Sequence, residues 1–173
     1  MHNIYIGGAG GVGKTTVGRL VETMLPSSTF YDGSDVFRRA TGVVPSESRA
    51  IRDADRRSND EYLGRLLRAN QRVILAGHFL LSPELVHLFD FACVLIAPQA
   101  VLIERRLEDT SRARATGALE VLNDCDETLA RLCAMLAASS RCCFAVPAID
   151  DARTVAARIA ALARAMDAGA LAG

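Results

Sequence analysis

Residues 8–15 form a run of residue types suited to holding phosphate, Gly-Ala-Gly-Gly-Val-Gly-Lys-Thr. Glycines let the backbone turn sharply with several N–H groups facing inward, which makes a concave anion site. The ammonium group of Lys14 would bind the β- and γ-phosphates of a nucleotide, and the hydroxyl of Thr15 would bind Mg²⁺. The run predicts a site for ATP and Mg²⁺ formed by Gly8, Gly10, Gly11, Val12, Gly13, Lys14, Thr15 and Thr16.

Lys14 differs from all the other basic residues. The chain has 20 lysine and arginine residues, and Lys14 is the single lysine among them. A planar guanidinium cannot replace a compact ammonium group on a flexible stem, so a lysine at this position indicates a specific role. The alternative is a glycine-rich turn that binds nothing, and the strand expected before the run and the helix expected after it disfavour that alternative.

Short apolar runs alternate with helical periodicities along the chain. We expect strands at residues 3–7, 28–32, 72–79, 91–97 and 142–147, which are rich in β-branched and aromatic residues. Ser34 and Ser82 are the expected N-caps of two of the helices. We expect helices at residues 14–25, 34–40, 46–70, 82–89, 98–109, 118–138 and 151–166, where apolar residues recur three and four positions apart.

This alternation predicts an α/β protein. Parallel strands need crossover helices that cover both faces, so we expect a three-layer α/β/α sandwich around a five-stranded, mainly parallel sheet. The 173 residues suffice for one core, and no linker or repeat divides them. We therefore expect a single domain over residues 1–173, with its ligand crevice at the carboxyl ends of the strands.

Several segments together resemble the P-loop nucleoside monophosphate kinases, in particular the short archaeal type of adenylate kinase. Besides the phosphate loop, they are YDGSDVFRRA at 31–40, VILAGHF at 73–79 and LIERRLEDTSRAR at 102–114. The resemblance implies ATP-dependent transfer to a nucleoside monophosphate. It implies that helices at about 33–70 bind this acceptor, with Arg38 on its phosphate and Asp35 nearby.

The same resemblance implies a short lid at about residues 109–117. Arg105 would pack beside the ATP, while Arg112 and Arg114 would approach its phosphates and take part in catalysis. Phosphoryl transfer needs positive charge around the moving group and a closing loop that excludes water, which favours this arrangement independently. The alternative is a solvated helix end in which these arginines pair with neighbouring acidic side chains.

The chain departs from that family at the end of the third strand. The family has a magnesium-holding Asp there, whereas this chain has Ala76, so Asp32 or Asp35 becomes the expected source of a metal partner. Two acidic residues after the second strand resemble the arrangement in shikimate-type kinases, where they serve metal and acceptor. Asp32 is expected in both roles and Asp35 at the acceptor. His78 either contacts the acceptor or is a hydrogen-bonded core residue.

Arginines also recur along one face of the expected helix at 46–70, at positions 49, 52, 56 and 57. Acidic residues interleave with them, among them Asp55. The pattern favours a solvated face with local ion pairs, and the alternative is the border of an anionic acceptor site.

Three functions fit these observations. The first is transfer of the γ-phosphoryl group of Mg-ATP to a nucleoside monophosphate, whose anionic oxygen needs no strong base. The second is transfer to a hydroxyl of a small metabolite or drug, with Asp32 or Asp35 as the general base. The third is a nucleotide-dependent regulatory ATPase, which the absence of the strand-end Asp favours and the paired lid arginines disfavour.

Composition argues against other classes. A formal net charge of zero disfavours broad binding to nucleic acid or anionic membrane. No apolar run approaches the roughly 20 residues of a membrane span. The five cysteines lack metal-ligand spacing and indicate reduced thiols, and the N-terminus has no leader pattern, so we expect a cytoplasmic protein. We expect it to act as a monomer or homodimer on small molecules.

Overall fold

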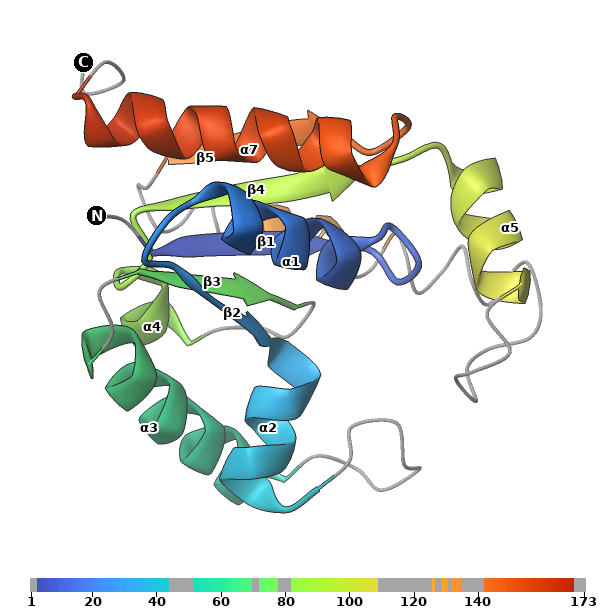
Figure 1. Ribbon diagram of the computed structural model, residues 1–173. Helices are drawn as coiled ribbons and strands as arrows, with labels where there is room; N and C mark the ends of the chain where they lie inside the picture. Colours follow the sequence, from blue (N-terminus) through green and yellow to red (C-terminus); the bar gives the residue numbers. More distant parts are fainter. Residues whose placement is uncertain are drawn as a thin grey trace.

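A five-stranded sheet forms the centre of the computed structural model, which describes residues 3–43, 52–69, 72–77, 82–108, 126, 129–130, 132–134 and 142–169 (Figure 1). The strand order is β2-β3-β1-β4-β5, and every neighbouring pair is parallel. The α/β class and the five strands predicted from the sequence are confirmed. The strands are β1 (Ile4–Gly8), β2 (Thr29–Asp32), β3 (Val73–Ala76), β4 (Phe91–Ile96) and β5 (Cys142–Pro147).

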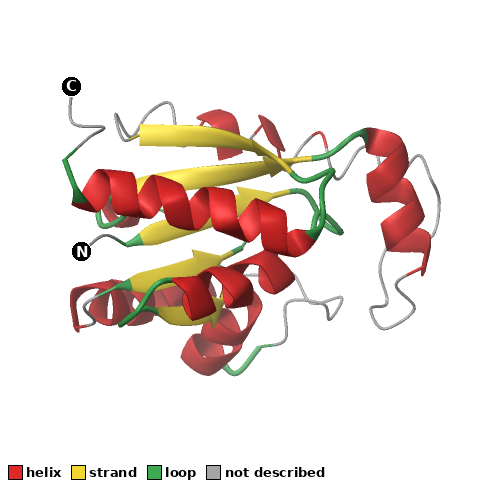
Figure 2. Cartoon of the chain, turned by 45° about the horizontal axis from the view of Figure 1, so that its top comes forward, coloured by secondary structure: helices red, strands yellow, loops and turns green. Residues whose placement is uncertain are grey.

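Helices cover both faces of the sheet, which completes the predicted three layers. α1 (Lys14–Met24) and α7 (Ala152–Asp167) share one core and lie in front of the sheet in Figure 2. α2 (Gly33–Thr41), α3 (Asp53–Ala69) and α4 (Pro83–Val86) contribute to the core on the opposite face. α5 (Gln99–Glu108) lies beyond the carboxyl ends of the strands (Figure 1). No helix in the described part of the chain is long and apolar enough to cross a membrane.

The side chains of successive residues in β1 pack alternately into the two hydrophobic cores on the opposite faces of the sheet. Ile4 and Ile6 pack on the α1–α7 side, and Tyr5 packs on the α3–α4 side. Side chains alternate along a strand, and both faces of this sheet are covered, so the central strands are apolar at nearly every position. Tyr5 is the one residue of β1 with a polar group on its side chain.

The N-cap residues of α2 and α4 mark where these two helices begin. The N-cap of α2 is Asp32, whose carboxylate accepts from the backbone N–H of Ser34 at 2.9 Å. The prediction of Ser34 as the cap is therefore wrong, because the residue before the helix supplies the acceptor that the first turn lacks. Ser82 is the N-cap residue of α4 as predicted, and α4 ends at Val86, three residues before the expected end.

Some expected helical segments fall only partly within the described residues. α3 begins at Asp53, and the expected start at 46–51 lies outside them. Of the expected helix at 118–138, residues 126, 129–130 and 132–134 are described and helical. Leu132 is buried against the same core as Tyr5.

Candidate active site

The phosphate loop joins the end of β1 to the start of α1. Gly11 and Gly13 have φ angles of 82° and 94°, a left-handed region that favours glycine. Gly13 is also the N-cap of α1, so the first amide groups of the helix, which lack partners within it, open onto the loop. A Cβ on Gly13 would meet no atom within 4 Å, so the space beside it is open. This geometry suits a bound anion.

Lys14 holds its positive charge over the same loop. Its Nζ donates to the carbonyl oxygens of Gly8 at 2.8 Å and of Ala9 at 2.7 Å. Both acceptors belong to the loop backbone, so the ammonium group is folded back across the anion site. An incoming phosphate would offer Nζ charged acceptors in place of neutral carbonyls, and such charge-assisted bonds are the stronger ones.

The hydroxyl of Thr15 donates to a carboxylate oxygen of Asp32 at 2.7 Å. The two residues are 17 positions apart in the sequence and meet because α1 begins, and β2 ends, at the same edge of the sheet. In the β2–β3 register Asp32 pairs with Ala76, the residue at the position where the resemblance to nucleoside monophosphate kinases led us to expect an Asp. The structure thus places an acidic side chain from the neighbouring strand beside the position where the sequence lacks one.

The oxygen atoms gathered here have the chemistry that Mg²⁺ prefers, since this ion binds hydroxyl and carboxylate oxygens and keeps several waters. Among the described residues, no group of three or more His, Cys, Asp or Glu side chains could hold a metal by itself. A metal at Thr15 and Asp32 would therefore depend on phosphate oxygens and water for its other ligands, as in other phosphate-loop sites.

α2 carries the predicted acceptor residues Asp35 and Arg38. The two side chains form an ion pair with an Nη2–Oδ1 distance of 3.0 Å, and both are more than half exposed. Asp35 stands in the first turn of α2, directly after the strand end that carries Asp32. The structure brings Asp35 and Arg38 together, as the sequence suggested, at the carboxyl edge of the sheet.

The inner face of α3 is more polar than expected. Asp55 and Asn59 lie one turn apart and are only 6% and 9% exposed. The Asp55 carboxylate accepts from the backbone N–H of Arg52 at 3.0 Å and from its Nε at 3.5 Å. The predicted solvated face with local ion pairs is found at Arg52, which is exposed and pairs with Asp55, whereas Asp55 itself is buried. The signal missed in the sequence is a repeat of every four residues, since Asp55 is followed at this spacing by Asn59, Leu63 and Leu67, which are buried on the same face of the helix.

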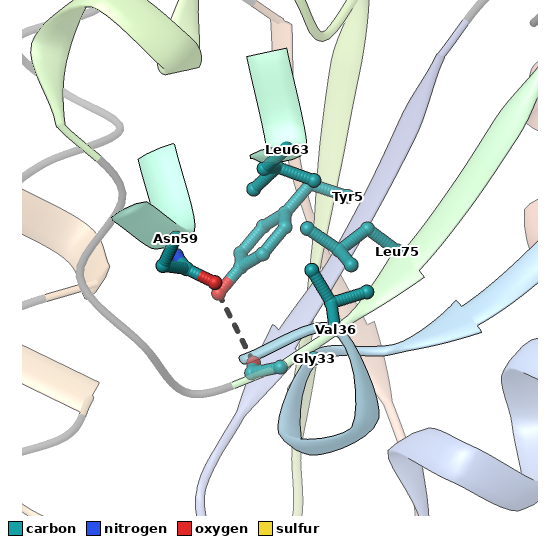
Figure 3. Close-up of a pocket in the computed structure, with 7 residues that line it drawn as sticks. Tyr5, Gly33, Val36, Asn59, Leu63 and Leu75 are labelled. Carbon is teal, nitrogen blue, oxygen red and sulfur yellow. Dashed lines mark hydrogen bonds between the residues drawn. The ribbon is translucent and has the colours of Figure 1, made fainter. Parts of the chain in front are cut away.

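A small pocket lies between α3, the start of α2, Tyr5 of β1 and the end of β3 (Figure 3). Its deepest polar group is the hydroxyl of Tyr5, which is 1% exposed and donates to the carbonyl oxygen of Gly77 at 3.1 Å. Asn59 points toward the same hydroxyl in Figure 3. Sequence reasoning missed both residues. We call this space the Tyr5 pocket; it is lined by Tyr5, Gly33, Val36, Asn59, Leu63, Leu75 and Gly77.

α5 packs directly on the phosphate loop. A Cβ on Gly11 would lie 2.8 Å from Cγ of Arg106 and 3.6 Å from the carbonyl oxygen of Leu102. The resemblance implied that Arg105 packs beside the nucleotide, yet its neighbour Arg106 is the residue whose stem lies against the loop. Only one of the two arginines can face the loop, because the side chains of adjacent residues in a helix point about 100° apart. His78, Arg112 and Arg114 lie outside the described residues.

No protein-family model matches the chain, and no curated protein matches it. Solved structures do match in fold. Shikimate kinase from Acinetobacter baumannii in complex with shikimate superposes with a TM-score of 0.72 at 21% identity, covering 95% of this chain and 94% of that chain. The chain has the fold of shikimate kinase.

Other kinases share this shikimate kinase fold. Shikimate kinase from Aquifex aeolicus gives a TM-score of 0.64 at 19% identity over 99% of both chains. A gluconokinase from Sinorhizobium meliloti gives 0.56 at 16% identity, covering 94% of this chain and 95% of its own. The similarity extends over nearly the whole length of these proteins and shows a shared fold. The acceptor has to be argued from this chain's own residues.

Proposed function

We propose that this protein transfers the γ-phosphoryl group of ATP to a hydroxyl group of a small molecule, with Mg²⁺ as cofactor. The observation that carries the proposal is the 2.7 Å contact between the Thr15 hydroxyl and the Asp32 carboxylate, beside Lys14 and the loop amides. A loop that binds phosphate needs only the glycines and the lysine. The carboxylate of Asp32 in contact with the Thr15 hydroxyl supports a magnesium site, and a magnesium site supports phosphoryl transfer.

Each residue of the loop has a separate task in this proposal. The amides of residues 8–15 and Lys14 Nζ bind the β- and γ-phosphates, and Lys14 exchanges its two loop carbonyls for phosphate oxygens. Thr15 and Asp32 would hold the Mg²⁺, which offsets negative charge on the triphosphate as the phosphoryl group leaves. Arg112 and Arg114 would add positive charge from the lid, as the resemblance implies.

Asp35 is proposed to act on the acceptor. In the reaction the acceptor oxygen bonds to the γ-phosphorus while the bond from that phosphorus to the bridging oxygen of ADP breaks. The hydroxyl proton passes to the Asp35 carboxylate, which stands in the first turn of α2 beyond the metal-side Asp32. Arg38 orients Asp35 through their 3.0 Å ion pair. A hydroxyl acceptor makes use of both acidic residues, whereas an anionic acceptor needs only the one at the metal.

A nucleoside monophosphate is the second candidate acceptor. The observation in its favour is the guanidinium of Arg38, more than half exposed at the carboxyl edge of the sheet, where it could bind an acceptor phosphate. In that case Arg38 would leave Asp35 for the acceptor, and no general base would be needed.

The test is Mg-dependent ATP consumption against a panel of nucleoside monophosphates and neutral or acidic alcohols, with products identified by mass. Lys14→Met should abolish turnover. Asp35→Asn should lower kcat by about 10²–10⁴ for a hydroxyl acceptor through loss of the base, and should mainly raise KM for a nucleotide acceptor. ATP turnover that no compound accelerates would instead support the regulatory ATPase.

Nucleotide binding has a readout independent of turnover. Lys14 is the single lysine of the chain, so an amine-reactive reagent labels one side chain besides the N-terminal amine. Mg-ATP should protect Lys14, and AMP alone should protect it far less, as measured by mass spectrometry of the loop peptide. Equal labelling with and without Mg-ATP would contradict the proposed function.

A further inference from the structure

Asp32 stands at the junction of two elements and contacts a third. It is the last residue of β2 and the N-cap of α2, and no residue separates the strand from the helix. The sheet holds its backbone, since Asp32 pairs with Ala76 in the β2–β3 register. The side chain therefore extends from the end of a paired strand and reaches the starts of both α1 and α2.

The two carboxylate oxygens of Asp32 have different partners. Oδ2 accepts from the Thr15 hydroxyl in the first turn of α1 at 2.7 Å, and Oδ1 accepts from the backbone N–H of Ser34 in the first turn of α2 at 2.9 Å. A carboxylate group is planar and stiff, so a movement of one oxygen also moves the other. One side chain thus joins the helix that follows the phosphate loop to the helix that carries Asp35 and Arg38.

The start of α2 depends on the bond from Ser34 to Asp32. The first amide groups of a helix have no partners within it, and a side-chain acceptor at the N-cap stabilises them. Val36 and Phe37 are buried and anchor one side of α2 against the core, whereas Asp32 holds its end. Asp35, the proposed base, directly follows Ser34 and is more than half exposed. The placement of its carboxylate therefore depends on how firmly the first turn is held.

Binding of Mg-nucleotide at the phosphate loop would strengthen the bond from Thr15 to Asp32. A hydroxyl whose oxygen binds a divalent cation is a stronger hydrogen-bond donor, because the cation withdraws electron density from the O–H bond. Thr15 would then hold Asp32 more firmly, and Asp32 in turn would hold the Ser34 amide. The linkage is reciprocal, so a first turn of α2 that is fixed in place would present Asp32 to Thr15 and the metal.

We propose that Asp32 is a positioning residue that couples Mg-nucleotide binding at the phosphate loop to the ordering of α2, through its separate bonds to Thr15 and Ser34. This inference rests on the proposed kinase function and adds how the nucleotide site and the acceptor helix communicate. Its consequence is that Asp35 and Arg38 are held more firmly in the nucleotide-loaded protein than in the free protein, so the acceptor binds more tightly after the nucleotide.

The experiment follows hydrogen exchange of the full chain by mass spectrometry, in peptides that cover the phosphate loop and α2. The probe is a non-hydrolysable ATP analogue, added with Mg²⁺ or with EDTA, and calorimetric titration sets equal occupancy in every sample. With Mg²⁺, the analogue should slow exchange in the first turn of α2 by about 5-fold or more, the lower end of the usual coupling between linked sites. With EDTA, it should protect the phosphate loop and leave α2 unchanged.

Substitutions of Asp32 separate coupling from capping. Asparagine caps a helix as well as aspartate does, so exchange of α2 in the free Asp32→Asn protein should change little. Its side chain has one acceptor oxygen in place of two, so it cannot offer separate oxygens to Ser34 and Thr15. The Mg-dependent protection of α2 should therefore be lost at equal occupancy. Asp32→Ser, which also caps well through a single oxygen, should behave in the same way.

Asp151→Asn is the matched control, because it removes one negative charge from the N-cap of a different helix. Oδ1 of Asp151 accepts from the backbone N–H groups of Arg153 and Thr154 in the first turn of α7, both at 3.0 Å. The asparagine can keep these bonds through its one acceptor oxygen. This variant should retain the full response of α2 to Mg²⁺ and the analogue.

The outcomes distinguish this inference from the proposed function. If the analogue with Mg²⁺ neither binds nor protects the phosphate loop, the proposed kinase function is wrong, and the coupling is wrong with it. If the analogue protects the loop and leaves α2 unchanged, the coupling is overturned and the kinase function stands. Equal protection of α2 in the wild type and in Asp32→Asn, or equal protection with EDTA and with Mg²⁺, would likewise overturn it, because the sites would then be connected by another route.

Discussion

Gly11 and Arg106 are in direct contact, so the last turn of α5 rests on the phosphate loop. A side chain on Gly11 would displace the Arg106 stem, since its Cβ would lie 2.8 Å from Cγ. The contact joins the loop to the helix that leads into the expected lid. Nucleotide binding should therefore depend on Arg106 more than on Arg105.

Arg106→Ala removes both the stem that covers the loop and a nearby positive charge. We expect it to weaken ATP binding by about 10-fold or more, in the range of a lost charge-assisted contact of ~1.5–3 kcal/mol. Arg105→Ala should weaken binding less, and Arg106→Met, which keeps the stem, should fall between the two. Titration calorimetry measures all three, and a larger effect at Arg105 would contradict this order.

The variant Asp32→Asn tests whether the negative charge of Asp32 contributes to Mg²⁺ binding, because it removes the charge and keeps the size of the side chain. Asparagine is as good an N-cap as aspartate, so α2 should keep its start and the melting temperature should change little. The Mg²⁺ concentration for half-maximal activity should rise by about 10- to 100-fold, as for the loss of a residue that orients a metal ligand. Thr15→Ser retains the hydroxyl and is the control. An unchanged Mg²⁺ dependence in Asp32→Asn would exclude a metal role for Asp32.

Two helix glycines should respond oppositely to alanine. A Cβ on Gly18 in α1 would overlap the Phe30 ring, lying 2.7 Å from Cδ2 and closer to Cε2. The helix gains about 1 kcal/mol from Gly→Ala, and overpacking costs about 1–3 kcal/mol, so Gly18→Ala should be destabilising. Gly64→Ala in α3 should be neutral to stabilising, because its closest neighbour is the flexible tip of Arg68 at 3.1 Å.

Urea unfolding measures both glycine variants. Phe30→Leu combined with Gly18→Ala should recover part of the loss, which a double-mutant cycle reports as coupling between the two positions. If Gly18→Ala is as stable as Gly64→Ala, α1 does not pack against Phe30 as described.

Asp60 should make stability depend on pH. Partial burial raises the pKa of this carboxyl, hydrogen bonds from Ser82 and Asn59 oppose the shift, and Glu84 adds to it. The folded state then binds the proton more tightly than the unfolded chain. The protonated form contributes stability below the unfolded pKa of about 3.9, and that contribution is lost as pH rises through the higher folded pKa.

Asp60→Asn should therefore raise the melting temperature at pH 7 and give no advantage at about pH 3, where the wild-type carboxyl is already protonated. Thermal unfolding across this range measures the difference. Glu61→Gln, at an exposed position of the same helix, controls for the loss of one negative charge. An Asp60→Asn advantage that persists unchanged at pH 3 would contradict the sign of the shift.

The alternation of strands and helices, the three layers and the phosphate loop could be predicted because the residues that cause them lie close together in the sequence. Apolar runs bounded by glycine indicate buried strands, and alternation with helices requires parallel crossovers. The loop geometry follows from Gly11, Gly13 and Lys14 within a few residues of one another. The sequence also indicated Asp32 and Asp35 as the acidic pair, because both follow the same strand.

The contacts between distant segments needed the tertiary structure. The contact between Thr15 and Asp32 arises because the start of α1 and the end of β2 lie at one edge of the sheet, and the rotation of α5 about its axis places Arg106 on the loop instead of Arg105. The alternating charges of α3 concealed that Asp55 and Asn59 face inward, and Tyr5 is indistinguishable in sequence from a core aromatic residue. A sequence determines local backbone geometry and hydrophobic pattern by itself, whereas the partner of each polar side chain is decided by packing between elements that the chain brings together only on folding.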